Sequence, residues 1–175
     1  KIGADGYMDP ENSRTGDYLA NICREITHKY NVDGIHLDYI RYPETWNIKV
    51  SREQGRQYIT NIVRKIHDAV KAEKPWVKMS CSPVGKSDDL SRYRSFGWNA
   101  YTKVCQDAQG WLKSGLMDEL FPMMYFKNEH FYPFAIDWQE QSHGKIVVPG
   151  LGIYFLDPKE GKWSINDVTA EMYHI

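Results

Sequence analysis

Hydrophobic and polar residues alternate along the chain with two different periods, and one of these is the period of an α-helix. In five stretches, apolar residues return every three or four positions, which is the spacing of a helix that buries one face. The clearest of these begins at Ser51, whose pairing with Gln54 is typical of a helix N-terminus, and ends at Lys74–Pro75. The pattern predicts helices over residues 18–30, 51–74, 101–115 and 131–138, and a last helix that begins at 164.

Four shorter stretches between the predicted helices have the alternation or the apolar content of buried strands. In the first of them Ile35 and Leu37 share one face, while His36 and Asp38 share the opposite face. Strands that alternate with helices predict a parallel sheet with right-handed connections. We therefore expect an α/β fold whose four strand–helix units equal half of an eight-stranded TIM-type barrel. The predicted strands are 32–38, 77–82, 120–125 and 146–153.

The stretch 33–43 organises the rest of the chain, because Asp38 stands where its strand passes into a loop. In parallel α/β folds, ligands and catalytic groups lie at the carboxyl ends of the strands. Arg41 and Tyr42 follow on the same loop, where they either bind ligand oxygens or hold Asp38 and the loop in place. His36 either fills the inner face of the sheet in a supporting role or contacts the ligand.

Composition and charge narrow the classes of function. A net charge of -1 over 175 residues gives no reason to expect a nucleic acid or an anionic membrane surface as partner. No apolar run is long enough to span a membrane. Cys23, Cys81 and Cys105 are scattered, so we expect buried, reduced thiols, and neither they nor the histidines have metal-ligand spacing. We therefore predict no metal and no other cofactor.

The residues at 33–43, DGIHLDYIRYP, resemble a glycosyl-hydrolase-like TIM-barrel family, long classed as a domain of unknown function. Further pieces match the family in order along the chain: 8–10, 111–118 and 122–125. The resemblance implies that residues 1–175 form a single partial domain, covering roughly strands 4 to 7 of a (β/α)8 barrel and their helices. It also implies a carbohydrate substrate and a secreted, periplasmic or cell-envelope location.

The same strand is similar to the fourth strand of two better understood barrels. In chitinases that strand carries spaced aspartates and then an acidic glutamate; Asp38 matches the last aspartate, and Ile40 takes the place of the glutamate. In the α-amylase family Asp38 matches the nucleophile, and His36 replaces an arginine. Met123 and Tyr125 resemble the chitinase pair that lines the sugar site.

Hydrolysis of a glycosidic bond needs two carboxyl groups, one ionised and one protonated. Asp38 is the predicted nucleophile or base. Glu44 and Glu129 lie in loops after the first and third predicted strands and are the predicted acids, although acidic loop residues are more often solvated surface charges. Trp98 is a predicted sugar-binding platform, unless it only packs. Looser candidates are the acids Asp88, Asp89 and Asp157 and the aromatic residues Trp46 and Tyr154.

Three hypotheses follow from these residues. The leading one is a glycoside hydrolase acting on a polysaccharide or cell-wall glycan through Asp38. The competing one is a non-catalytic glycan-binding barrel that has lost its acid, since Ile40 and residues 81–83 offer no carboxylate. The third is a fragment without independent activity. Half a barrel leaves two open sheet edges, which predicts self-association through them.

Overall fold

The computed structural model describes residues 6–91, 93 and 97–175. The fold is mixed α/β, and its parallel strands are compatible with a partial TIM-type barrel. Four strands form one parallel sheet in the order β1-β2-β3-β5, and two more form a parallel pair, β4-β6. The strands are β1 Gly34–Leu37, β2 Lys78–Cys81, β3 Glu119–Leu120, β4 Met123–Met124, β5 Ile146–Val147 and β6 Gly150–Leu151.

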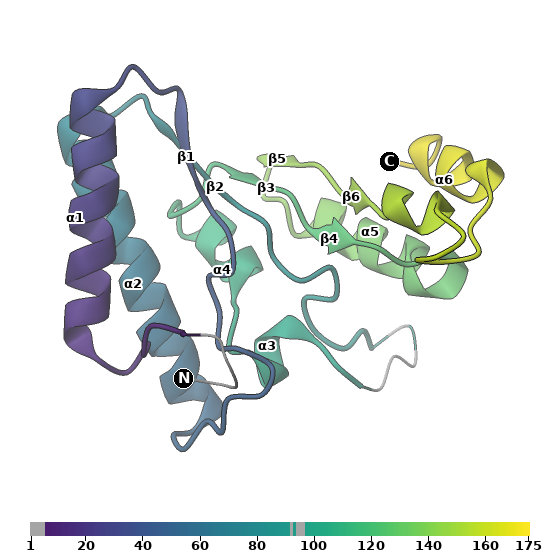
Figure 1. Cartoon of the computed structure of the whole chain (residues 1–175), viewed down its shortest axis with the longest axis horizontal. Coiled ribbons are helices and arrows are strands. Elements are labelled where there is room, and N and C mark those ends of the chain that lie inside the picture. Colours follow the sequence, from purple (N-terminus) through teal and green to yellow (C-terminus); the bar gives the residue numbers. More distant parts are fainter. Residues whose placement is uncertain (1–5, 92, 94–96) are drawn as a thin grey trace.

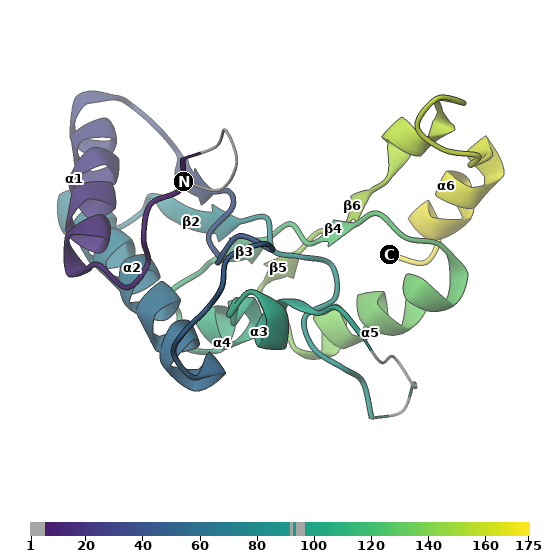
Figure 2. The same cartoon turned by 60° about the horizontal axis from the view of Figure 1, so that its bottom comes forward.

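Along the chain, helices alternate with the strands of the sheet. Figures 1 and 2 show α1 and α2 lying side by side at one end of the molecule and α6 at the other end. In Figure 2, α2, α4 and α5 lie along one face of the sheet. The helices are α1 Ser13–Lys29, α2 Arg52–Glu73, α3 Ala100–Lys103, α4 Ala108–Lys113, α5 Tyr132–Glu140 and α6 Ile165–Met172, with 3-10 turns at Asn128–His130 and Ile153–Leu156. Among the described residues, no helix combines the length and the apolar character that crossing a membrane requires.

The predicted alternation of β1 and β2 is confirmed. Ile35 is buried and pairs with Met79, which is fully buried in the neighbouring strand. On the other face His36 and Lys78 are exposed, and Ser80 is half-buried. The two strands therefore present one apolar face to the helices and one polar face to the opposite side, where the candidate chemistry lies.

Two predicted helix starts are also confirmed. Ser51 accepts a hydrogen bond from the backbone N–H of Gln54 at the start of α2. Ser164 and Asp167 form a reciprocal capping box at the start of α6. In both cases a side-chain oxygen accepts from a backbone N–H that has no carbonyl partner within the helix.

The prediction of one helix over 101–115 is wrong, because the chain breaks between α3 and α4. Cys105 has φ = 55°, in the left-handed region that interrupts a right-handed helix. The next residue, Gln106, turns its side chain into the core, where it is fully buried. The break places the buried amide of Gln106 between the segments that follow β1 and β2. Gln106 therefore becomes part of the candidate site described below.

Two predicted strands are each divided by a proline. Pro122 separates β3 from β4, and Pro149 separates β5 from β6. Proline has no backbone N–H to donate to a strand ladder, so the pairing stops and resumes beyond it. The result is a change of partner, since β4 and β6 form their own two-stranded sheet.

Candidate functional site

The candidate site lies at the carboxyl end of β1, where Asp38 follows Leu37 with an exposed side chain. The backbone N–H of Tyr39 donates to Asp38 Oδ1 over 2.8 Å. Tyr39 has φ = 53°, a conformation that costs a non-glycine residue energy and that the surroundings must hold. The strand therefore ends in a tight turn that presents the Asp38 carboxylate to solvent.

Three side chains hold this turn together. Arg41 Nη1 lies 2.7 Å from Glu44 Oε1, and the Tyr39 hydroxyl donates to Glu44 Oε2 over 2.9 Å. The Arg41 guanidinium also stacks 4.1 Å above the centre of the Tyr39 ring, and the ring of Tyr7 stacks on Tyr39 at 5.6 Å. The Arg41 side chain is only 8% exposed, and its Nε has no hydrogen-bond partner among the described residues. We call Tyr39, Arg41 and Glu44 the β1 clamp.

Glu44 is held as an anion by the β1 clamp. Desolvation acts to raise the pKa of this carboxyl, but the backbone hydrogen bond and the contacts with Arg41 and Tyr39 outweigh it and hold the pKa below its ordinary value. A glycosidase acid needs a raised pKa, because it must keep its proton until the leaving group takes it. These contacts argue against Glu44 as the acid. Glu129 is exposed in the turn that follows β4.

His36 is fixed by two hydroxyl groups of the adjacent strand and its exit. Its Nδ1 lies 2.9 Å from Ser80 Oγ, and its Nε2 lies 2.8 Å from Ser82 Oγ. The ring edge of Phe121 packs against it at 5.7 Å between centroids. Because both ring nitrogens have partners within the protein, the contacts favour the supporting role over direct ligand contact.

Tyr42 lies in the core, with no exposed surface. Its backbone N–H donates to the carbonyl of Val104 over 3.0 Å, and its hydroxyl donates to Glu11 Oε1 over 3.4 Å. Burial raises the pKa of the Tyr42 hydroxyl, and the charge of Glu11 raises it further. Of the two roles predicted for this residue, its position supports holding the loop and gives its ring no face for a ligand.

Gln106 connects two strand exits and was not among the predicted site residues. Its Oε1 accepts from the backbone N–H of Val84, which follows β2, over 2.9 Å. Its Nε2 donates to the carbonyl of Ile40, which follows β1, over 3.1 Å. Periodicity carries no signal of this role, because the pattern placed Gln106 inside a continuous helix, away from its apolar positions.

Aromatic side chains gather near the ends of β4 and β6. Tyr125 is 36% exposed and meets Tyr154 edge to face, with centroids 5.6 Å apart. Tyr154 in turn packs on Phe155 at 4.1 Å. Met123 is half-buried within β4, and Trp98 is exposed in the segment that precedes α3. The structure thus places exposed aromatic surface beyond the strand ends, on the sequence positions predicted for sugar contact.

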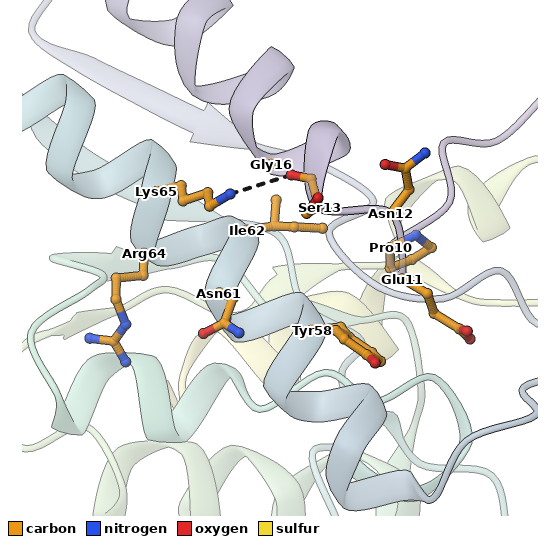
Figure 3. Close-up of a pocket in the computed structure, with 10 residues that line it drawn as sticks. All are labelled: Pro10, Glu11, Asn12, Ser13, Gly16, Tyr58, Asn61, Ile62, Arg64 and Lys65. Atoms are coloured by element: carbon orange, nitrogen blue, oxygen red, sulfur yellow. Dashed lines mark hydrogen bonds between the residues drawn. The ribbon is translucent and has the colours of Figure 1, made fainter.

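Two cavities bear on the choice of site. One, with a volume of about 200 Å³, is lined by Asp38, Tyr39 and Arg41 together with residues of α1 and α2. The other, of about 280 Å³, lies between α1 and α2, and Figure 3 shows Lys65 donating to the carbonyl of Ser13 across it. None of the predicted site residues lines this second cavity. The first cavity borders Asp38 on the side of β1 that faces α1 and α2, and it is the one of the two that predicted site residues line.

Metal ligands do not cluster in the part of the chain that the structure describes: no group of three or more histidine, cysteine, aspartate or glutamate side chains converges there. Cys23, Cys81 and Cys105 are free and buried, as predicted. Burial raises the pKa of the Cys81 thiol, and the charge of Asp38 raises it further.

The family model and the curated relatives that this chain matches are all described as glycosyl hydrolases or glycosyl hydrolase-like. The model of a family described as glycosyl hydrolase-like 10 matches residues 47–155, a range that begins after Asp38 and Glu44. The chain is 25% identical over 157 residues to the glycosyl hydrolase YngK of Bacillus subtilis strain 168, covering 75% of this chain and 31% of that protein. It is 25% identical over 138 residues to the glycosyl hydrolase DigH of Escherichia coli K12, covering 68% of this chain and 31% of that protein. The chain spans about a third of the length of these curated relatives.

Proposed function

Because the chain belongs to the glycosyl hydrolase-like 10 family, we propose that it carries part of the active site of a glycoside hydrolase. The proposed reaction is hydrolysis of O-glycosidic bonds in a polysaccharide or cell-wall glycan. The observation that supports it most is an exposed aspartate at the carboxyl end of a parallel strand, whose carboxylate accepts a hydrogen bond from the backbone N–H of Tyr39.

We propose that residues 1–175 belong to one partial (β/α)8 domain and supply roughly its strands 4 to 7. The parallel order β1-β2-β3-β5 supports this assignment, as does the run of helices along one face of the sheet in Figure 2. In this arrangement Asp38 belongs to the fourth strand of the barrel, the strand that carries catalytic carboxylates in chitinases and in the α-amylase family.

In the proposed mechanism the Asp38 carboxylate attacks the anomeric carbon or activates the attacking water. The Tyr39 backbone N–H orients it, and the β1 clamp keeps that turn in place. His36 supports the inner face through its two serine partners. Glu129 is the proposed acid at these strand ends, since Glu44 is held as an anion.

The proposed substrate is a carbohydrate that lies across the strand ends. Tyr125 and Trp98 offer exposed rings that can pack against the apolar face of a sugar, and Met123 extends that surface. Arg41 lines the cavity beside Asp38, and its guanidinium, which contacts Glu44 and Tyr39, holds the loop that borders the proposed sugar site.

The test is Asp38→Asn in the full-length protein, assayed against a panel of glycans. The amide keeps the shape of the carboxylate but cannot act as nucleophile or base, so we expect turnover to fall by about 10³-fold or more. Asp33→Asn is the matched control, because Asp33 is an exposed aspartate at the opposite end of the same strand. Unchanged turnover in Asp38→Asn would remove Asp38 from the mechanism, and glycan binding without any product in the unmodified protein would support the non-catalytic hypothesis.

We also propose that the isolated chain associates with itself. The outer strands of the four-stranded sheet, β1 and β5, each have only one neighbour among the described strands, and an unpaired strand edge offers backbone groups to another chain. Sedimentation at rising concentration should show dimers or larger species. A monomer that unfolds cooperatively across that range would contradict the proposal.

A further inference from the structure

Two side chains that can carry positive charge meet at the carboxyl ends of β2 and β4. Lys86 leaves β2, and His130 lies in the turn that leaves β4. Lys86 Nζ is 3.4 Å from His130 Nδ1. The lysine is half-buried, and its ammonium group lies 5.4 Å from the centre of the Phe126 ring and 5.1 Å from that of Phe134.

The backbone that carries Lys86 is held from two sides. Trp138 Nε1 donates to the carbonyl of Gly85 over 2.7 Å, and the N–H of Ala100 donates to the carbonyl of Lys86 over 2.9 Å. A Cβ at Gly85 would lie only 2.4 Å from the carbonyl oxygen of Met123, so glycine is what allows this segment to approach β4 so closely. The position of Lys86 relative to β4 is therefore set before any ligand arrives.

The pair has no counter-ion within the described ranges 6–91, 93 and 97–175. Lys71 and Lys127 are also half-buried, and each lies close to a carboxylate, Asp118 at 3.1 Å and Asp167 at 3.3 Å. Within the described part of the chain, no such ion pair forms at Lys86 or His130. Lys86 is the charged member of the pair, so a ligand anion placed beside it would be attracted by a positive charge that no carboxylate among the described residues neutralises.

We propose that Lys86 and His130 bind the carboxylate of an acidic sugar unit, which makes a carboxylated glycan the substrate class. This rests on the proposed function, because the two residues lie at the strand ends where that glycan is proposed to bind. In the tautomer of His130 whose Nδ1 accepts from the Lys86 ammonium, Nε2–H is a second donor. One positive charge with two donors matches a singly charged carboxylate better than a doubly charged phosphate.

The test measures binding of three matched oligosaccharides to the full-length protein by calorimetry. One is neutral, one contains a uronic acid, and one contains a sugar phosphate. We expect the uronic acid form to bind about 10- to 100-fold more tightly than the neutral form, the range that hydrogen bonds to a charged group provide. Lys86→Gln and His130→Gln should remove most of that difference, and Lys86→Arg should keep it.

Lys113→Gln is the matched control, because Lys113 is an exposed lysine that ends α4, before β3 begins, and it should leave all three affinities unchanged. Equal affinity for the neutral and uronic acid forms, or tightest binding of the phosphorylated form, would overturn the proposal. An equal loss of affinity for all three oligosaccharides in Lys86→Gln would also overturn the proposal, because an equal loss indicates a disturbed structure and not the loss of a charge contact.

A second readout separates this proposal from the proposed hydrolysis. Free D-glucuronate, but not D-glucose, should shift the NMR signals of the His130 ring. Hydrolysis of neutral and acidic glycans at equal rates, with no shift at His130, would leave the glycosidase and remove the acidic subsite. A shift at His130 without hydrolysis of any glycan would leave the acidic subsite and remove the proposed glycosidase activity.

Discussion

At the exit of β1 the Glu44 carboxylate accepts from Tyr39 and lies against Arg41, whereas in α6 both oxygens of Glu171 are buried and have no hydrogen-bond partner among the described residues. The pKa values of the two groups move in opposite directions. The contacts at Glu44 outweigh desolvation and lower its pKa. Burial of Glu171, with the charge of Asp167 adding to it, raises that pKa to about 7.

The contrast shows what raises the pKa of a carboxyl group in this fold. Withdrawing a carboxyl group from water favours its protonated form only where donors do not replace the water. Glu44 has such donors and suits the role of a fixed anion, while Glu171 has the environment of an acid but is only 1% exposed. Of the two predicted acids, Glu44 is disfavoured by its contacts, and Glu129 stays the proposed acid because it is exposed in the turn that leaves β4.

Among the substitutions that test this contrast, the largest effect should come from breaking the β1 clamp at its cation, with Arg41→Met. The substitution keeps an apolar stem near Tyr39 but leaves Glu44 without its opposite charge and frees the turn that presents Asp38. We expect turnover of the full-length protein to fall about 10- to 100-fold, since small displacements of a reacting group are costly. Arg41→Lys should recover only part of the loss, because an ammonium does not reproduce the flat guanidinium stack. Turnover within twofold of the unmodified protein would contradict a positioning role.

A smaller effect is expected from Glu171→Gln, and it should depend on pH. The folded-state pKa of Glu171 lies above its ordinary value of 4.5, so the stability that the neutral carboxyl contributes is full below pH 4.5 and is lost as pH rises through about 7. Urea unfolding should show the unmodified protein losing on the order of 2 kcal/mol relative to the variant between those pH values. Glu160→Gln, at an exposed turn, is the control and should show no such trend. Parallel stability curves for the variant and the unmodified protein would contradict a buried, unpartnered carboxyl.

The smallest effect should come from Glu44→Gln. The amide oxygen can still accept from Tyr39, and only the charge facing Arg41 is lost. We expect turnover to stay within about tenfold, whereas loss of a general acid costs about 10²- to 10⁴-fold. A loss in that larger range, relieved by substrates whose leaving group needs no proton, would reinstate Glu44 as the acid.

Local patterns predicted much of the fold. Alternation at Ile35 and Leu37 placed β1 correctly and therefore placed Asp38 at its end, and the cap residues Ser51 and Ser164 began their helices as predicted. These features depend on neighbours within a few positions. The patterns could not show the left-handed turn at Cys105, because it is stabilised by contacts that form only in the folded chain.

The candidate site was predicted less completely, for the same reason. Gln106 bonds to Val84 and Ile40, which lie 22 and 66 positions away, so no local pattern carries that information. The burial of Tyr42 and the two serine partners of His36 likewise depend on elements distant in the sequence. Residue type and strand position made Asp38 the predicted nucleophile or base, and the contacts of the turn that carries it became visible only in three dimensions.

Chemical rescue of Asp38→Gly tests the central claim most directly. Removing the side chain leaves space beside the cavity for a small anion, and formate or azide can then take the place of the missing carboxylate. We predict that turnover of the full-length Asp38→Gly protein is lost and rises with the concentration of added formate, while Asp33→Gly keeps its turnover and does not respond. Full turnover in Asp38→Gly, or a loss that neither anion restores at any concentration, would contradict the claim that the Asp38 carboxylate performs the chemistry.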